Sequence, residues 1–371
     1  MTSTTRTRRN PRIEVLRLVA VLAIAIFHTF QAWFSAAMGG TWDPSTPMLW
    51  LLGCTSLLGA YGNHVFYLIS GMFLLPKAMR DAANEGYWSR QLRSLGRRVA
   101  TIAITVVLYA LVALAVSTWV VPIEGVSLSE TSWLIEGLEF IWVYLVLVAI
   151  VPLVGKIFAA LPYHNAIVGL LTGVVFVVNG YIAFISPGNE VRSLLEWRKL
   201  MSAVSYLIAF LVGGVIGERE PASRKHARTG LVLTITVCAI VEAIAAGVNA
   251  LSVLEALSYK STSLLSFALA VASLVFAAST SENDTNDAYS RTSEAAIRLA
   301  QGTLGFYIAQ SMSSSLWRAS FETLCTSALE MGGEPALLIV GILLSVALVA
   351  IMLIVDVLVR VPILRRLRLA R

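Results

Sequence analysis

Charged residues are scarce in this chain of 371 residues. Asp, Glu, Lys and Arg together make up 13% of the sequence, whereas a soluble domain carries roughly 25%. Hydrophobic residues make up 57%. Because so few polar side chains are available to cover a surface in water, an ordinary soluble protein is excluded. The composition predicts a polytopic helical membrane protein.

Cysteine is also rare, and its spacing matches no known site. The three cysteines, Cys54, Cys238 and Cys325, lie far apart in or beside apolar stretches. This pattern excludes a disulfide framework and a zinc site. The net charge of +6 does not indicate nucleic-acid binding either, because the cations lie in short segments between apolar runs. We therefore expect no metal and no nucleic-acid partner.

Apolar windows long enough to cross a bilayer, at about 20 residues for each span, recur along the whole sequence. They fall at 13–38, 49–76, 99–121, 134–155, 166–186, 201–217, 230–250, 261–280, 299–318 and 335–357. The sequence thus predicts an all-α transmembrane helical bundle of about ten spans. The membrane-embedded domain would cover 13–357, between basic tails at 1–12 and 358–371.

The distribution of cations predicts the orientation of the bundle. With the N-terminus in the cytoplasm, 22 Lys and Arg residues fall on the cytoplasmic side. Only 5 fall on the other side, and these are Arg192, Arg198, Lys199, Lys260 and Arg318. Such an excess is the positive-inside signal for an even number of spans with both termini cytoplasmic.

The first predicted span contains three ionisable residues, Glu14, Arg17 and His28. Arg17 and His28 are eleven residues apart, about three helical turns, so both project from one face, about 16 Å apart along the axis. Ionisable side chains at such a depth usually face a cavity or the bundle interior, which makes them functional candidates. Two simpler explanations remain open. His28 can hydrogen-bond a neighbouring helix, and Arg17 can extend to the headgroups with Glu14 as its partner.

The second predicted span contains two small residues, Ser70 and Gly71, which let a ligand or another helix approach the backbone closely. Packing alone would explain them. The apolar run that holds them, 48–76, is longer than one straight crossing needs. We therefore expect a break in this helix near Gly59 to Gly62.

Four arginines, Arg90, Arg93, Arg97 and Arg98, precede the third predicted span on its cytoplasmic side. Guanidinium groups pair with phosphate oxygens in a fork geometry, so the cluster is a candidate receptor for a polyphosphorylated ligand. It can also be a topology determinant that contacts anionic lipid.

Taken in order, these motifs resemble the acyltransferase-3 family of membrane acyltransferases, particularly members that acylate surface polysaccharide. The first three family motifs are matched by Glu14, Arg17, Phe27 and His28, then by Phe66, Ser70 and Gly71, then by Arg90 and Arg93 or by Arg97 and Arg98. Later matches are Trp142, Tyr144, Pro152, Gly305, Tyr307, Pro362 and Arg365. The sequence departs from the family at Ile141 and Gln310, where a His is common, so neither position receives an acid or base role.

The resemblance implies an acyl-CoA-dependent O-acyltransferase, with acetyl-CoA as the expected donor. The acceptor would be a hydroxyl of a cell-surface glycan or lipid-linked saccharide. His28 would act as general base or as acyl carrier, with Arg17 and Glu14 beside it in the catalytic set. The four arginines would bind the donor phosphates, with Ser70 and Gly71 close to the donor. The expected location is the plasma membrane of a bacterium, in contact with membrane lipids.

A transporter or flippase for a lipid-linked saccharide is the alternative, in which buried His28, Arg17 and Glu242 would form a proton relay. Many transporters contain inverted repeats, and no repeat is evident in this sequence. A non-catalytic assembly partner in the membrane is a second alternative.

Overall fold

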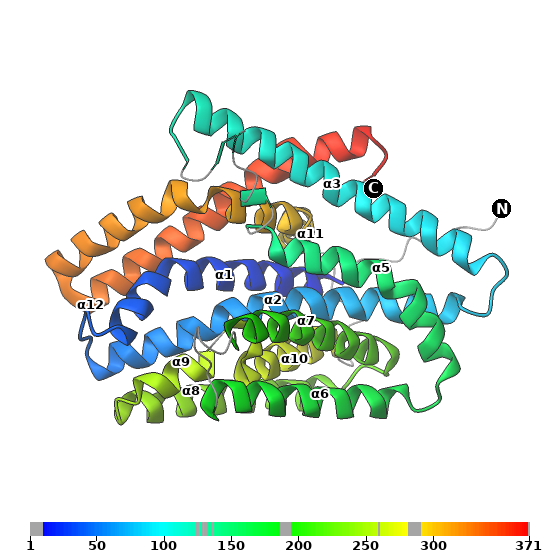
Figure 1. Ribbon diagram of the computed structural model, residues 1–371, viewed down its shortest axis with the longest axis horizontal. Helices are drawn as coiled ribbons and strands as arrows, with labels where there is room; N and C mark the ends of the chain where they lie inside the picture. Colours follow the sequence, from blue (N-terminus) through cyan, green and yellow to red (C-terminus); the bar gives the residue numbers. More distant parts are fainter. Residues whose placement is uncertain are drawn as a thin grey trace.

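The computed structural model describes residues 10–123, 126–127, 129, 133–134, 137–185, 194–258, 260–280 and 291–369 (Figure 1). Helices account for 87% of the structure, and no strand occurs in these ranges. The predicted all-α class is therefore confirmed.

Long helices make up most of the bundle. In chain order the described elements are α1 (Pro11–Met38), α2 (Thr46–Asp81), α3 (Tyr87–Trp119), α5 (Glu139–Ala160), α6 (His164–Gly180), the π-helical turn η1 (Tyr181–Ile185), α7 (Leu194–Glu218), α8 (Arg224–Gly247), α9 (Leu251–Ser258), the 3-10 turn η3 (Lys260–Thr262), α10 (Leu264–Ala278), α11 (Arg291–Ala300) and α12 (Thr303–Arg366).

Eight of the described helices are long and apolar enough to cross a bilayer. They are α1, α2, α3, α5, α6 together with η1, α7, α8 and α12. Helix α10 is apolar but shorter, at 15 residues. A multi-pass membrane protein is therefore confirmed, while the count of ten spans and the side on which each terminus lies stay predictions.

Helix α12 is a helical hairpin of 64 residues. Gly333 interrupts it with φ 69° and ψ −165°, a conformation that is essentially confined to glycine. The two arms turn back along one another in Figure 1. The sequence predicts a gap between spans ending at 318 and beginning at 335. The polar residues of this gap are helical as far as Gly333, because they carry no proline before Pro335, and they extend the first arm.

Helix α2 lies at the centre of the bundle, packed along α1 and α7 (Figure 1). Small residues make both contacts close. A Cβ atom at Gly62 would lie 2.6 Å from the carbonyl oxygen of Ala20 in α1, and one at Gly71 would collide with that of Phe210 in α7. The predicted break near Gly59 to Gly62 is wrong, since α2 is one unbroken helix and these glycines serve its packing.

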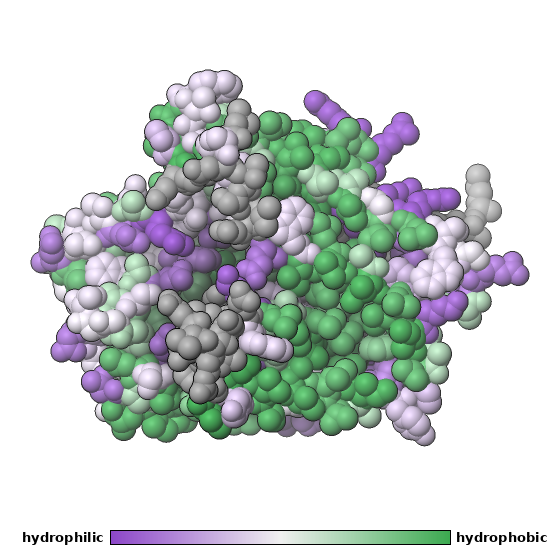
Figure 2. Space-filling view, in the orientation of Figure 1, coloured by the Kyte–Doolittle hydropathy of each residue, from purple (hydrophilic) through white to green (hydrophobic). Residues whose placement is uncertain are grey.

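Burial separates the central helices from the peripheral ones. The apolar windows of α1, α2 and α7 are 56%, 61% and 56% buried, whereas those of α3, α6 and α8 are 22% buried. The exposed positions of the peripheral helices are apolar, as at Val107, Leu170 and Leu233. Figure 2 shows apolar residues across the middle of the molecule and polar residues towards two opposite ends, as expected for a bundle surrounded by hydrocarbon.

The sequence predicts a basic tail at each end of the chain. Most of the N-terminal tail, 1–9 of 1–12, lies outside the described residues, and α1 begins at Pro11 after Asn10, whose Oδ1 accepts a hydrogen bond from the Arg12 N–H at 3.0 Å. The predicted C-terminal tail, 358–371, is helical as far as Arg366. This segment therefore belongs to the packed second arm of α12.

Candidate active site

The uninterrupted helix α1 presents Arg17 and His28 on one face. Arg17 Nη1 lies 3.3 Å from Glu14 Oε2, and the two side chains are 31% and 7% exposed. Arg17 also lies within electrostatic range of Tyr307 in α12. Glu14 thus holds the guanidinium group at one end of this face. The pair agrees with the simpler explanation from the sequence, in which Glu14 is the partner of Arg17.

His28 is half-buried, three turns further along α1. Its Nδ1 lies 3.3 Å from Gln31 Oε1. With Nδ1 as the donor to this amide oxygen, Nε2 keeps its lone pair and is able to accept a proton. Gln31 is a site residue that the sequence analysis missed. Its position one turn from His28 is the signal that could have identified it.

Arg318, in the first arm of α12, lies within electrostatic range of His28. Its Nε is buried without a hydrogen-bond partner among the described residues, and the same is true of Nε1 of the adjacent Trp317. Leaving a buried donor unpaired costs about 1–3 kcal/mol, so such donors indicate a ligand or water site. The sequence places Arg318 at the end of the predicted span 299–318, and α12 continues past it.

Helix α3 begins at Tyr87, so Arg90, Arg93, Arg97 and Arg98 lie on its first turns. The first three are exposed and Arg98 is half-buried. Among the described residues, none of the four guanidinium groups has an ion-pair or hydrogen-bond partner. The spacing places Arg90, Arg93 and Arg97 on one side of the helix, where they can converge on a common ligand.

An aromatic cluster connects the arginine of α1 with those of α3. The ring of Phe66 in α2 lies 4.8 Å from that of Tyr144 in α5 and 5.0 Å from that of Tyr307 in α12, measured between centroids. Arg98 lies within electrostatic range of Tyr144, as Arg17 does of Tyr307. One cation each of α1 and α3 is therefore within electrostatic range of the same cluster.

Ser70 and Gly71 make contacts within the helix bundle. The Ser70 hydroxyl donates to the carbonyl oxygen of Phe66 at 2.9 Å, inside α2. Gly71 faces the backbone of Phe210 in α7, where any larger side chain would collide. These are contacts of helix packing, and the place of both residues beside a donor stays a prediction.

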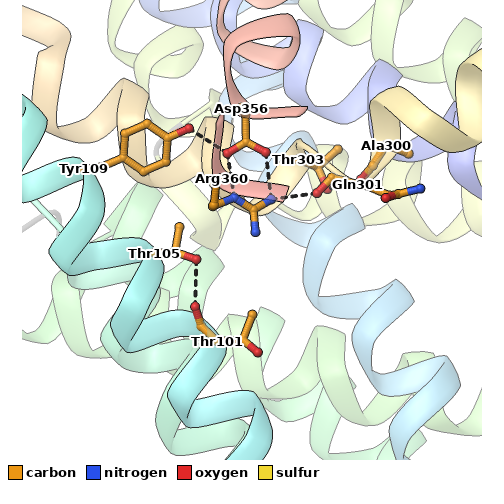
Figure 3. Close-up of polar contacts among 8 residues, drawn as sticks. All are labelled: Thr101, Thr105, Tyr109, Ala300, Gln301, Thr303, Asp356 and Arg360. Atoms are coloured by element: carbon orange, nitrogen blue, oxygen red, sulfur yellow. Dashed lines mark hydrogen bonds and ion pairs between the residues drawn. The ribbon is translucent and has the colours of Figure 1, made fainter. Parts of the chain in front are cut away.

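A buried ion pair in the second arm of α12 is a further feature that the sequence analysis missed. Asp356 and Arg360 are 0% and 3% exposed. Arg360 Nε and Nη2 donate to the two carboxylate oxygens at 2.6 and 2.7 Å, and the Tyr109 hydroxyl donates to Oδ1 at 2.6 Å (Figure 3). Arg360 Nη2 also donates to the carbonyl oxygen of Gln301 at 2.8 Å. Gly305 leaves room for the carboxylate, because a Cβ atom there would overlap Asp356 Oδ1.

Glu242 in α8 is fully buried and faces α2, where a Cβ atom at Gly53 would collide with its Oε2. Its carboxylate oxygens have no hydrogen-bond partner among the described residues. The described contacts connect it with neither His28 nor Arg17. Within the described ranges, no three His, Cys, Asp or Glu residues are grouped so that they could hold a metal ion.

A cavity of about 1310 Å³ lies between α1, α2, α8 and α10. Helix α1 lines it with Val15, Val19 and Leu22, which lie on the side of the helix opposite to Arg17 and His28. The arginines of α3 do not line it either. We call this cavity the α1 groove. It is separate from the face that carries the predicted catalytic residues.

A protein-family model described as an acyltransferase domain, of the acyltransferase-3 type, matches residues 10–355, nearly the whole chain. The match begins just before α1 and ends in the second arm of α12. Comparisons with curated proteins and with solved structures gave no match. The family match therefore includes the α1 face with His28 and the arm of α12 with Arg318.

Proposed function

Because the chain belongs to the acyltransferase-3 family and is a membrane acyltransferase, we propose that it transfers an acyl group from acyl-CoA to a hydroxyl group of a cell-surface glycan or lipid-linked saccharide. Acetyl-CoA is the proposed donor and a bacterial plasma membrane the proposed location. The observation that carries the mechanism is the half-buried His28, whose Nδ1 pairs with Gln31 and leaves Nε2 to act as a base.

The arginines of α3 support a donor site at that end of the bundle. Arg90, Arg93 and Arg97 are exposed on one side of the helix, and guanidinium groups bind phosphate oxygens in pairs. The donor's acyl end would then follow the α1 face inwards, past the aromatic cluster around Phe66. From Arg17 to His28 this path is about 16 Å long.

His28 acts as the general base in the proposed reaction. The acceptor hydroxyl oxygen attacks the carbonyl carbon of the thioester, and Nε2 of His28 takes the hydroxyl proton. The carbon–sulfur bond then breaks, an ester bond remains on the acceptor, and the departing thiolate takes the proton from the imidazolium. A general base of this kind typically contributes a factor of about 10²–10⁴ to the rate.

We assign Arg318 to the oxygen of the attacked carbonyl group. Negative charge develops on this oxygen during the attack, and a preorganised donor stabilises it. Arg318 has a buried Nε without a partner in the described part of the chain, and it lies within electrostatic range of His28. Arg17 is held by Glu14 at a distance from His28, so we assign this pair to donor positioning.

Attack by His28 itself on the thioester would give an acyl-histidine intermediate, from which the acceptor would take the acyl group. A radiolabelled acetyl-CoA incubated without acceptor separates the two routes. Stable label on the wild-type protein that is absent from His28→Ala supports the covalent route. Family membership favours acyl transfer over the transporter alternative and over a non-catalytic role.

The test of the proposed function is thiol release from acetyl-CoA by the purified full-length protein. We expect release only with an acceptor from a panel of oligosaccharides and lipid-linked saccharides, and a loss of about 10²- to 10⁴-fold in His28→Ala. His226→Ala is the matched control, because His226 is exposed on α8 and its Nδ1 lies 2.7 Å from the hydroxyl of Ser223. An unchanged rate in His28→Ala, or flipping of a lipid-linked saccharide without any acyl donor, would overturn the proposal.

A further inference from the structure

We propose that Glu322, in the first arm of α12, binds one hydroxyl group of an uncharged saccharide acceptor while another hydroxyl group reacts at His28. The place of the reacting hydroxyl at His28 rests on the proposed function. The place of Glu322 beside it follows from the way in which α1 and the first arm of α12 lie against each other.

Helix α1 and the first arm of α12 run in the same direction. Arg17 lies within electrostatic range of Tyr307, and His28 lies within electrostatic range of Arg318. In both helices the second residue of these pairs comes eleven positions after the first. The two helices thus stay in register over three turns, and in Figure 1 both run towards the end of the bundle at which α12 turns back.

Glu322 lies on the side of α12 that faces α1. It follows Arg318 by one helical turn, about 6 Å further along the axis. It also lies within electrostatic range of Cys325, which is 0% exposed and belongs to the same apolar cluster as Phe30 and Ala37 of α1. Glu322 is therefore placed between two residues that lie close to α1.

This part of the bundle is the one farthest from the arginines of α3. The backbone N–H of Ser45, just before α2, donates to Oε1 of Glu334, just after the turn of α12, at 2.7 Å. The end of α1 and the turn of α12 therefore lie at one end of the bundle, and the first turns of α3 lie at the other (Figure 1). An acceptor that enters beside Glu322 does not compete with a donor held by the arginines of α3.

Small residues leave the interface beside Glu322 accessible. Ala32, one turn beyond His28 in α1, and Ala319, next to Arg318 in α12, are both exposed. The side chains of His28, Arg318 and Glu322 are only half-buried. These three polar side chains therefore keep surface that a substrate can contact.

Arg318 and Glu322 also keep their hydrogen-bonding capacity for a ligand. They are oppositely charged and one turn apart, a spacing at which such side chains commonly pair. Neither of them has an ion-pair or hydrogen-bond partner among the described residues, and Nε of Arg318 is buried. A donor and an acceptor that stay apart at this spacing can both be used by a substrate between α1 and α12.

The chemistry of these groups selects an uncharged saccharide. Nε2 of His28 takes the proton of the reacting hydroxyl, and the carboxylate of Glu322 accepts a hydrogen bond from a second hydroxyl about one turn away. Arg318 is assigned to the carbonyl oxygen of the donor, so an acidic sugar would meet the carboxylate of Glu322 without compensation. Like charges placed opposite each other in this way suppress the wrong partner.

The experiment is saturation-transfer NMR of the full-length protein in detergent with maltotriose, cellotriose, mannotriose or the acidic trigalacturonic acid. We expect at least one uncharged trisaccharide to bind and trigalacturonic acid to bind more weakly. Glu322→Ala removes a charged hydrogen-bond acceptor and should weaken binding of the uncharged sugar roughly 10- to 100-fold. Glu330→Ala, at an exposed position of the same arm, is the matched control and should change nothing.

Glu322→Gln separates the charge of this side chain from its size. It keeps an acceptor oxygen, so it should weaken binding of the uncharged sugar less than Glu322→Ala does. It also removes the repulsion, so trigalacturonic acid should bind more tightly than it binds the wild type. Gel-filtration and melting profiles identify the variants that fold, and if Glu322→Ala does not fold, Glu322→Gln decides.

Saccharide binding and acyl transfer are tested separately. Where an uncharged sugar supports thiol release from acetyl-CoA, Glu322→Ala should raise the KM for the sugar and leave the KM for acetyl-CoA unchanged. Sugar binding that depends on Glu322 without any thiol release would overturn the proposed acyl transfer and leave the saccharide site in place.

Four results would overturn the assignment of Glu322. The first is wild-type sugar binding in folded Glu322→Ala. The second is tighter binding of trigalacturonic acid than of every uncharged sugar by the wild type. The third is a wild type that binds none of the uncharged sugars. The fourth is displacement of the sugar by acetyl-CoA, which would make this part of the interface a donor site.

Discussion

The two arms of α12 each place an arginine against other helices, but the surroundings of these arginines are opposite. Arg360 in the second arm is 3% exposed and donates to Asp356 and to the carbonyl oxygen of Gln301. Arg318 in the first arm lies near His28, and its buried Nε has no hydrogen-bond partner among the described residues. The same kind of side chain is thus fully paired in one arm and incompletely paired in the other.

This difference separates a structural cation from a functional one. A buried charge whose partners are all supplied by the protein holds helices in register, and removal of one partner leaves the other uncompensated. A buried donor without a partner is instead ready for a ligand or a transition state. We therefore interpret Arg360 as positioning α12 against α3 and α11, and Arg318 as part of the reaction site.

Asp356→Ala should have the largest effect on stability. It leaves Arg360 buried without its counter-ion, and breaking a buried pair in this way costs about 3–5 kcal/mol. The measurement is the free energy of unfolding in mixed micelles. The double variant Asp356→Leu/Arg360→Met removes both charges and should recover most of the loss. Equal instability of the single and double variants would show that the pair does not explain the packing.

Arg318→Gln should have the complementary effect. Hydrogen bonds to charged groups contribute about 1.5–3 kcal/mol, so kcat/KM should fall by roughly 10- to 100-fold. The free energy of unfolding should change by less than about 0.5 kcal/mol, because no described partner is left unpaired.

Two other variants sharpen this second prediction. Arg318→Lys keeps the charge without the fork geometry and should recover part of the rate. Arg366→Gln removes an exposed arginine of the same helix and is the control. Its kcat/KM and its free energy of unfolding should both be unchanged. A variant Arg318→Gln that unfolds easily yet keeps wild-type kcat/KM would place Arg318 with Arg360 as a structural residue.

The fold class follows from composition because hydropathy reports contact with lipid, and a span in lipid must be helical. Hydropathy does not report where a helix ends. The polar segment before Gly333 leaves the apolar pattern but stays helical, which is why a gap is predicted there. In α2, Gly59 and Gly62 suggest a break when only the neighbouring sequence is considered. Their role is to let α2 pack closely against α1, a contact that the neighbouring sequence does not show.

The part of the candidate site that lies on a single helix is predictable from the sequence. Arg17 and His28 share a face because of helical periodicity alone, and Gln31 lies within the same pattern. The roles of Arg318 and Asp356 depend on residues far away in the sequence. Arg318 lies within electrostatic range of His28 in α1, and Asp356 accepts a hydrogen bond from Tyr109 in α3. Ile141 and Gln310, the two departures from the family pattern, are buried at 1% and 4% exposure, which the sequence alone does not reveal.

Gln31→Ala should have the smallest effect and should act through kcat. Loss of one neutral hydrogen bond removes about 0.5–1.5 kcal/mol, which corresponds to a fall in kcat of roughly 2- to 12-fold. The KM for acetyl-CoA should stay constant, because Gln31 orients the His28 ring and is not assigned to the donor. Gln31→Glu keeps an acceptor oxygen for Nδ1–H and should retain most of the rate. If KM rises while kcat is unchanged, Gln31 contacts a substrate. The reaction site beside the first arm of α12 would then include a substrate-binding surface on α1.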